Sequence, residues 1–411
     1  MVDTDSSPIS IYTNELHELR TWLAKRSFLL ARTMGIMGPP NRNGIIISCV
    51  ILSMAACCLG GEAAAAQASI PIPVPALYVL GDSLADAGTN NYLPTLLRAN
   101  FKHNGVDYPG RESTGRFSNG KNFVDFLAEH LNLASPPPYL SICGPSSDNS
   151  TYLKGVNFAS GGAGVSSQTN MGQCMSLDGQ IDKHYSEVHA SLVQQLGQEK
   201  ASAHLGRSMF ALSIGGNDIL NYVRPNLVKQ LISRPPQTRK EFIDSLSRSL
   251  EGQLQRMYEL GMRKLFVVGA APIGCCPVLR ERAPGNECDA EANDLSARYN
   301  VVVASLLRQM SGRHPDFRYS LFDAAGALLQ YIQRPQENGY EVVDSACCGL
   351  GDKNAMFLCA PLSRLCKNRT NHIFWDFVHP TETTAKKLTA VAFYGSSPFV
   401  TPRSVQQICD I

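Results

Sequence analysis

The sequence predicts an α/β fold built on a parallel sheet of about five strands, with helices covering both faces. Short apolar runs alternate along the chain with long stretches of helical periodicity, an order typical of parallel strands joined by right-handed crossovers. The runs are apolar throughout, as expected for strands that are buried on both faces. No repeat and no linker divides the chain after residue 69, so we predict one domain over residues 69–411.

Five apolar runs are the expected strands of this sheet. The first follows Pro71, Pro73 and Pro75, a stiff lead-in that cannot itself join a central strand because proline has no N–H to donate. Valine, leucine, isoleucine and aromatic residues dominate the runs, which favours strands over turns. The expected strands are residues 76–80, 155–160, 208–214, 264–269 and 317–322.

Between the strands, apolar residues recur at helical spacing. Phe123, Phe126, Leu127 and Leu131 follow the three- and four-residue steps of an amphipathic helix. The other expected helices are residues 180–204, 241–260, 290–310 and 381–393. Residues 102–119 are rich in Gly, Asp and Arg without periodicity and are predicted to be a surface loop. We expect this loop and residues 170–180 to form the walls of a binding pocket.

The N-terminal region has the pattern of a targeting segment. Residues 45–59 are apolar, Arg42 precedes them, and residues 66–68 fit an A-x-A cleavage site, as in a signal peptide. The apolar core is short for a membrane-spanning helix and lies far from Met1. We therefore predict that translation starts at Met37, so that residues 1–36 are an extension outside the translated protein and residues 37–68 are the signal peptide. An uncleaved signal anchor is the alternative.

Cysteines and sequons also indicate the secretory pathway. The chain has thirteen cysteines, and the ten that follow the apolar segment suggest disulfides whose pairing the sequence leaves open. Asn149 and Asn368 begin N-x-S/T sequons and are candidate glycosylation sites. A metal site is the alternative use of the cysteines, but C-x-x-C pairs and an H-E-x-x-H motif are absent from the sequence, so we expect no metal and no cofactor. The net charge of +2, without a dense basic run, argues against a nucleic-acid partner.

Three of the expected strands end in glycine and polar residues. Ser83 follows the first strand, Gly161 the second and Asn217 the third. Taken alone, each cluster is typical of a turn. Because parallel strands present their carboxyl ends at one edge of the sheet, the three clusters are expected to meet in one crevice.

A fourth cluster lies near the C-terminus. Asp376 and His379 stand three residues apart, directly before Pro380, which favours the start of a helix. A helix N-terminus is the plain interpretation. In the alternative, the carboxylate bonds one ring nitrogen of His379 and leaves the other free as a base toward Ser83.

With these four clusters, the chain resembles the plant-type GDSL esterase/lipases of the SGNH hydrolase superfamily. The matching blocks are GDSLADAGTNNY at residues 81–92, GVNFASGGAG at residues 155–164, IGGND at residues 214–218 and DFVHPTE at residues 376–382. The resemblance implies a three-layer α/β/α sandwich with a flavodoxin-like sheet. It also implies that Ser83 is the nucleophile, His379 the general base and acid, and Asp376 the residue that orients His379.

The resemblance further implies an oxyanion hole formed by the N–H of Ser83, the N–H of Gly161 and the side-chain amide of Asn217. The expected function is a secreted serine esterase or lipase acting on acyl lipid, cutin or acetylated polysaccharide, without stable membrane insertion after signal cleavage. An acyltransferase with the same residues and a non-enzymatic binding or defence protein are the alternatives. The expected location is the cell wall or apoplast, with the vacuole or a signal-anchored form as alternatives.

Overall fold

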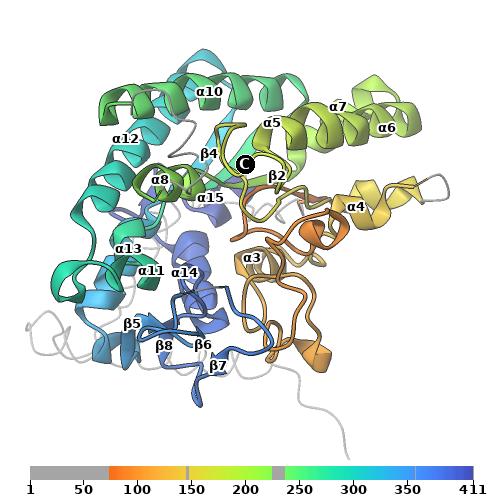
Figure 1. The fold of residues 1–411 in the computed structure, drawn as a ribbon. Coiled ribbons are helices and arrows are strands. Elements are labelled where there is room, and N and C mark those ends of the chain that lie inside the picture. The colour runs from red at the N-terminus through yellow and green to blue at the C-terminus, as the bar shows by residue number, and fades with distance from the viewer. Residues whose placement is uncertain (1–73, 145–147, 225–236, 357, 411) are drawn as a thin grey trace, which may run out of the picture. The chain divides into compact units, whose positions relative to one another are not determined.

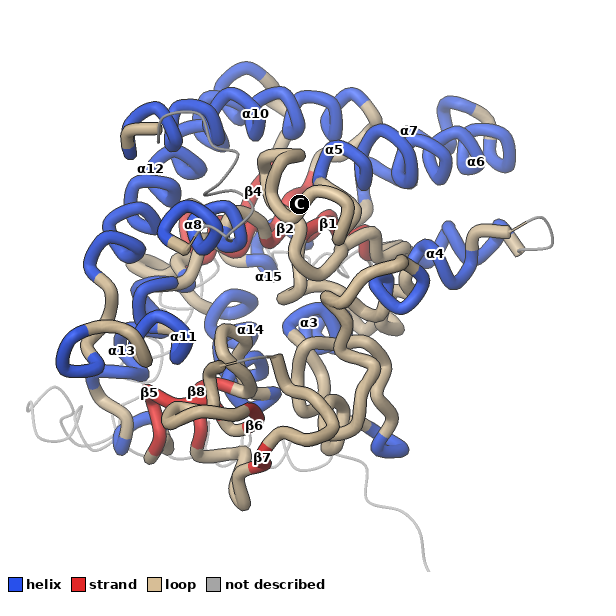
Figure 2. Tube along the Cα trace, in the orientation of Figure 1, coloured by secondary structure: helices blue, strands red, loops and turns tan. Residues whose placement is uncertain are grey.

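The computed structural model describes residues 74–144, 148–224, 237–356 and 358–410 (Figures 1 and 2). The described residues belong to one compact unit, residues 71–411. The predicted extension over residues 1–36 and the predicted signal peptide over residues 37–68 lie outside the described residues.

A five-stranded sheet forms the centre of this unit, in the order β1-β2-β3-β4-β9. The first four strands run parallel to one another, and the short β9 pairs antiparallel with β4. The strand bounds are β1 Leu77–Gly81, β2 Met209–Ser213, β3 Lys264–Val268, β4 Arg318–Phe322 and β9 Val400–Thr401. The predicted α/β class and the parallel sheet of about five strands are confirmed.

The predicted strand over residues 155–160 is not a regular strand. Its residues follow the free edge of β1 and donate from Phe158 N–H to Val79 O (2.7 Å) and from Ser160 N–H to Gly81 O (3.0 Å). Its other side meets Pro137 and Pro138, which have no N–H and cannot extend a ladder. The segment still gives the sheet the connectivity of a flavodoxin-like fold, in which the second segment flanks the first.

Helices cover both faces of the sheet, as Figure 1 shows. Alternate residues of β1 point to opposite faces, with Tyr78 and Leu80 in one core cluster and Leu77 and Val79 in another. The first face is covered by α6 Ser186–Leu196, α7 Gln198–Arg207, α10 Arg239–Glu259 and α12 Ala290–Arg313. The second face is covered by α3 Phe123–His130, α13 Ala324–Gln333, α14 Glu382–Tyr394 and α15 Val405–Cys409.

The remaining short elements connect these layers. The helical ones are η1 Thr89–Tyr92, η2 Pro109–Arg111, α4 Tyr139–Ile142, η3 Asn149–Lys154, α5 Leu177–Gly179, η4 Gln180–Tyr185, α8 Gly216–Val223, η5 Ile273–Cys275, α11 Pro277–Arg280, η6 Pro284–Asn286 and η7 Gln336–Asn338. The short strands β5 Val342–Ala346 and β8 His372–Phe374 form one pair, and β6 Cys348–Gly349 and β7 Arg364–Leu365 form another.

The long helix predicted over residues 180–204 is broken into three pieces. A single π-helical stretch, η4, leads into α6, and Gly197 separates α6 from α7. Gly197 has a φ of 78°, a left-handed conformation that glycine adopts without strain and that ends a helix. The other four predicted helices are confirmed with ends shifted by a few residues.

Three disulfides confirm the prediction that the cysteines pair. They join Cys275 to Cys288, Cys347 to Cys366 and Cys348 to Cys359. Two of the three lie in the segment from β5 to β8, which we call the disulfide lobe (residues 342–374). The four other cysteines within the described part are free: Cys143, Cys174, Cys276 and Cys409.

Candidate active site

Ser83 is placed by a tight turn at the end of β1. Gly81 has a φ of 143°, and a Cβ at this position would meet the Ser213 carbonyl oxygen at 2.3 Å, so a side chain cannot be accommodated there. Asp82 N–H then donates to the same oxygen of Ser213 at 3.0 Å. The turn leaves the Ser83 N–H without a hydrogen-bond partner among the described residues. The Ser83 side chain is thus held at the carboxyl edge of the sheet with its N–H available.

Gln180, the first residue of η4, fixes the same turn. Nothing in the sequence pattern singled this residue out. Its side-chain oxygen accepts from Gly81 N–H (2.8 Å), and its Nε2 donates to Gly81 O (2.8 Å) and to Met175 O (2.9 Å). The Gln180 side chain is fully buried. This amide pairs with both backbone groups of Gly81, sharing the carbonyl oxygen with Ser160 N–H, and restrains the residue two before Ser83.

Asp376 and His379 lie on a loop after β8. The two carboxylate oxygens of Asp376 each lie 2.8 Å from His379 Nδ1, and one of them also accepts from His379 N–H at 2.9 Å. Trp375 N–H donates to His379 O at 2.7 Å and closes the loop. A carboxylate at Nδ1 favours the tautomer whose Nε2 is free to accept a proton.

The disulfide lobe holds this loop in place. Cys347 N–H donates to Phe374 O (3.0 Å), and Cys348 N–H donates to Trp375 O (2.7 Å), directly before Asp376. The fully buried Trp375 also donates from its indole nitrogen to Asn104 Oδ1 at 2.9 Å. Residues 102–119, predicted to be a surface loop, are therefore partly buried, because they pack against the residues around His379.

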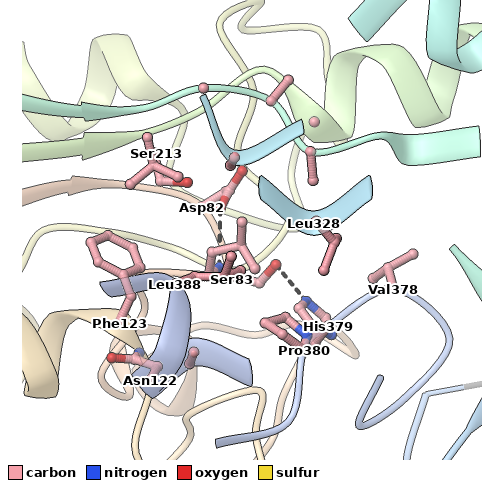
Figure 3. A pocket seen from close by; sticks show the side chains of 18 of the residues that line it. Asp82, Ser83, Asn122, Phe123, Ser213, Leu328, Val378, His379, Pro380 and Leu388 are labelled. Atoms are coloured by element: carbon pink, nitrogen blue, oxygen red, sulfur yellow. Dashed lines mark hydrogen bonds between the residues drawn. The ribbon is translucent and has the colours of Figure 1, made fainter. Parts of the chain in front are cut away.

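The structure brings Ser83 and His379 together. The Ser83 Oγ lies 2.6 Å from His379 Nε2, and Figure 3 shows the two side chains joined by this hydrogen bond. Phe117 packs against the imidazole, with ring centroids 4.9 Å apart. Ser83, His379 and Asp376 thus form one chain of hydrogen bonds, and all three side chains are buried.

Asn217 and Gly161, the other two predicted site residues, differ in their surroundings. Asn217, at the start of α8, lines the same cavity as Ser83 and His379. Its Nδ2 donates one hydrogen to Ala163 O at 3.0 Å, which leaves the second hydrogen of the amide available. The Gly161 N–H donates instead to a carboxylate oxygen of Asp86 at 2.9 Å.

Asp86 is a second residue that the sequence pattern did not single out. Besides Gly161, its carboxylate accepts from Gly88 N–H (2.7 Å) and Thr89 N–H (2.6 Å). Burial raises the pKa of Asp86 to about 6, against the lowering effect of these donors. One carboxylate therefore fastens the loop after Ser83 to the loop around Gly161.

Two further ionisable groups line the cavity. Burial raises the pKa of Asp82 to about 7, and the charge of nearby Asp218 acts in the same direction. Burial also raises the pKa of the Cys276 thiol to about 12. A thiol that stays protonated at neutral pH is a poor nucleophile.

Within the described residues, no group of three or more His, Cys, Asp or Glu side chains is arranged to hold a metal ion. Of the helices in the described ranges, none combines the length and the apolar character needed to cross a membrane.

Comparison with known proteins agrees with these observations. The family model of the GDSL-like lipases/acylhydrolases matches residues 77–391. The chain belongs to this family. The GDSL lipases/acylhydrolases are serine carboxylic ester hydrolases, and the matched range contains all four blocks of the sequence resemblance.

Individual relatives of this GDSL chain are plant proteins. It is 39% identical over 344 residues to a GDSL esterase/lipase of Arabidopsis thaliana, covering 82% of this chain and 90% of the relative. A second Arabidopsis thaliana GDSL esterase/lipase is 38% identical over 341 residues, covering 82% and 89%. Among solved structures, a mutant of the acetyl-xylooligosaccharide esterase Axe2 from Geobacillus stearothermophilus matches with a TM-score of 0.37 and 12% identity, covering 78% of this chain and 93% of that one.

The cavity of this GDSL hydrolase is lined by Ser83 and has a volume of about 130 Å³. The prediction that residues 102–119 wall the pocket is confirmed only for Phe117 and Ser118, and residues 170–180 do not line it. Most of the walls come from the carboxyl ends of β1 to β4 and from α13 and α14 (Figure 3), because these helices pack over the edge of the sheet where the serine lies.

The two sequons lie away from this cavity. Asn149 begins the short helix η3. The Asn368 side chain is exposed, and its oxygen accepts from Thr370 N–H (3.0 Å) and from the Thr370 hydroxyl (2.7 Å). Glycosylation at both asparagines stays a prediction.

Proposed function

We propose that this GDSL family member hydrolyses carboxylic esters through an acyl-enzyme on Ser83. The observation that supports this is the chain of contacts from Ser83 Oγ to His379 Nε2 (2.6 Å) and from His379 Nδ1 to Asp376 (2.8 Å). His379 removes the proton as Ser83 Oγ bonds the ester carbonyl carbon, and the carbonyl π bond opens to an oxyanion. When the C–O bond to the alcohol breaks, the imidazolium returns that proton to the leaving oxygen.

The second half of the reaction repeats the first with water. Water enters the site after the alcohol has left, and His379 removes its proton while the hydroxide oxygen bonds the acyl carbon. The new oxyanion collapses, the bond to Ser83 Oγ breaks, and His379 returns the proton to the serine. Asp376 stays ionised throughout and stabilises the imidazolium in the required orientation.

The negative oxygen of each tetrahedral intermediate requires donors that are already in place. The unpartnered Ser83 N–H and the second hydrogen of the Asn217 amide support these two residues in that role. Gly161 can contribute only if its N–H shares the hydrogen that now goes to Asp86 or turns away from that carboxylate. We therefore propose Ser83 and Asn217 as the main donors and Gly161 as a donor that depends on Asp86.

The proposal is tested by combining a Ser83→Ala variant with a fluorophosphonate probe. The wild-type protein should be labelled on Ser83 and should hydrolyse a p-nitrophenyl ester, whereas Ser83→Ala should lose both reactions and keep its unfolding transition. Ser202→Ala, an exposed serine on α7, is the matched control and should behave as wild type. Substantial turnover by Ser83→Ala would show that another group is the nucleophile.

The cellular route belongs to the same proposal. Three disulfides are typical of an oxidising compartment, and the sequons at Asn149 and Asn368 agree with passage through the secretory pathway. We therefore propose that residues 37–68 act as a signal peptide and that the mature protein is secreted. N-terminal sequencing of the mature protein and a mobility shift on enzymatic deglycosylation test both points, and an intact segment 37–68 would contradict cleavage.

A further inference from the structure

The cavity at Ser83 is lined by a layer of apolar side chains deep in the molecule. On one side lie Phe266 and Val268 of β3, which point to the same face because they are two residues apart, and Phe322 of β4, which pairs with Val268. On the other side lie Ala385, Leu388 and Ala392 of α14, at spacings of three and four residues that place them on one face of the helix. The cavity is therefore a gap between a sheet and a helix.

Small side chains create this gap. Ala385 and Ala392 face the sheet where α14 would otherwise fill the space, and both are almost fully buried. The Thr389 hydroxyl, also in the wall, donates to Ala385 O at 2.7 Å, so it offers no free donor to a ligand. Away from Ser83, Asn217 and His379, the cavity presents mainly hydrocarbon.

Building on the proposed esterase function, we infer that this cavity holds the acyl chain of the substrate and that the preferred acyl group is of medium length, about six carbons. An apolar protein cavity of about 150 Å³ holds one benzene molecule, and the cavity here measures about 130 Å³. Six carbons are therefore what the space accepts without rearrangement of the helix.

The mechanism favours the acyl chain over the alcohol as the occupant. The acyl group stays bonded to Ser83 through both half-reactions, whereas the alcohol must leave and water must take its place. A buried apolar gap retains a hydrocarbon chain and excludes water from it. A leaving group confined there would obstruct its own departure, so the alcohol is assigned to the side of Ser83 that faces away from this gap.

Two substrate series separate these assignments in the wild-type protein. In the first, p-nitrophenyl esters from acetate to dodecanoate vary the acyl chain with a constant leaving group. In the second, acetate esters of methanol, butanol and hexanol vary only the alcohol. We expect kcat/KM to rise by about four-fold per methylene up to hexanoate, since burial of each methylene stabilises the complex by about 0.8 kcal/mol, and to fall beyond octanoate. The alcohol series should change less than about two-fold in total, because its chain stays outside the apolar gap.

Variants on α14 test the location of the chain. Ala392→Leu adds three carbons to the gap and should lower the ratio of kcat/KM for hexanoate over acetate by about 60-fold, the loss of three buried methylenes. Ala390→Leu is the matched control, because Ala390 lies on the same helix but outside the cavity lining. This control should keep the wild-type ratio. Leu388→Ala enlarges the gap and should move the optimum toward longer chains, which provides a second reading if Ala392→Leu does not fold.

The outcomes separate this inference from the proposed function. A flat acyl series, a steep alcohol series, or equal effects of Ala392→Leu and Ala390→Leu would overturn the assignment of the cavity while ester hydrolysis remained. Absence of both hydrolysis and fluorophosphonate labelling at Ser83 in a folded protein would overturn the proposed function itself.

Discussion

Ser83 and His379 reach the same point of the molecule from regions that are built differently. The serine region consists of the end of β1 and the loops around it, and it is held by buried hydrogen bonds from Gln180 and Asp86. The histidine region consists of the loop 375–380 and the disulfide lobe, which lie outside the main sheet. Non-covalent polar contacts position Ser83, whereas two covalent links stabilise the segment that positions His379.

This difference predicts which kind of substitution should most disturb each region. Buried amide and carboxylate contacts are costly to leave unpaired, so the serine region should be sensitive to single polar substitutions. A lobe with a small core depends on its cross-links, so the histidine region should be sensitive to loss of a disulfide. Variants in and between the two regions test this contrast, in order of decreasing effect.

Asp376→Asn should have the largest effect, because it acts inside the histidine region without changing its backbone. The asparagine amide cannot hold His379 in the tautomer that leaves Nε2 free, and kcat should fall by about 10⁴. Steady-state kinetics with a p-nitrophenyl ester measure this loss. The unfolding midpoint should change little, and near-normal kcat would show that Asp376 does not orient the base.

Asn217→Ala should lower kcat by about 10²–10³ with little change in KM, because the amide acts on the negative oxygen of the transition state. Asn217 belongs to neither region, so we expect the fall in kcat to come in addition to the effects of substitutions in the serine and histidine regions. Comparison of kcat and KM for the variant and the wild type provides the test. A change confined to KM would identify Asn217 as a ground-state binding residue.

Gln180→Ala tests the serine region. Gly81 N–H would lose its partner, and Gly81 O would lose one of its two donors and keep Ser160 N–H, which should lower the free energy of unfolding by about 3 kcal/mol. Displacement of the Ser83 turn should lower kcat roughly ten-fold. Urea unfolding and kinetics measure the two effects. Gln198→Ala, an exposed glutamine on α7, is the control, and an equal response of the two variants would contradict a positioning role.

The paired substitution Cys348→Ser with Cys359→Ser tests the histidine region. It opens a loop with a sequence separation of 11 and should lower the free energy of unfolding by about 3 kcal/mol. Because Cys348 N–H donates to the carbonyl oxygen of Trp375, the residue before Asp376, kcat should also fall several-fold. The control removes the Cys275–Cys288 bridge, with a sequence separation of 13. Its loss should lower the free energy of unfolding by a similar amount and should lower kcat by less. Equal kcat values in the two variants would contradict a role of the disulfide lobe in positioning His379.

Asp82→Asn should have the smallest effect on kcat of these variants, and its effect should be seen in the pH dependence of stability. Burial raises the pKa of Asp82 from 3.8 to about 7, so between these values the folded protein keeps a proton that the unfolded chain has lost. The contribution of Asp82 to the free energy of unfolding therefore falls as the pH rises through this window, by at most about 1.4 kcal/mol per pH unit.

Asparagine keeps the acceptor for Leu84 N–H and removes the titration. Urea unfolding at several pH values should therefore show a slope between pH 4.5 and 7 that is more positive in the variant than in the wild type. Asp352→Asn, at an exposed position, should keep the wild-type slope. Parallel slopes for Asp82→Asn and the wild type would show that Asp82 titrates alike in the folded and unfolded chains.

Several parts of the fold could be predicted because they depend on local patterns. Apolar runs such as residues 264–269 identify strands that are covered on both faces, and the spacing in residues 123–131 identifies α3. The long helix over residues 180–204 was wrong in detail because apolar spacing does not reveal a break: residues 180–185 form the π-helical η4, and Gly197 separates α6 from α7. The segment 155–160 is extended but irregular because its second neighbour consists of prolines.

The sequence by itself determined which residues can carry the chemistry: a serine after a buried strand, an asparagine after another, and a carboxylate and imidazole three residues apart. These choices depend on residue type and short spacing, which the chain carries locally. Only the tertiary structure decided that Gln180 and Asp86 hold the serine region, that the Gly161 N–H is already bonded, and that α14 and the sheet enclose an apolar cavity. Each of these is a contact between segments far apart in the chain, and packing of the whole core fixes such contacts.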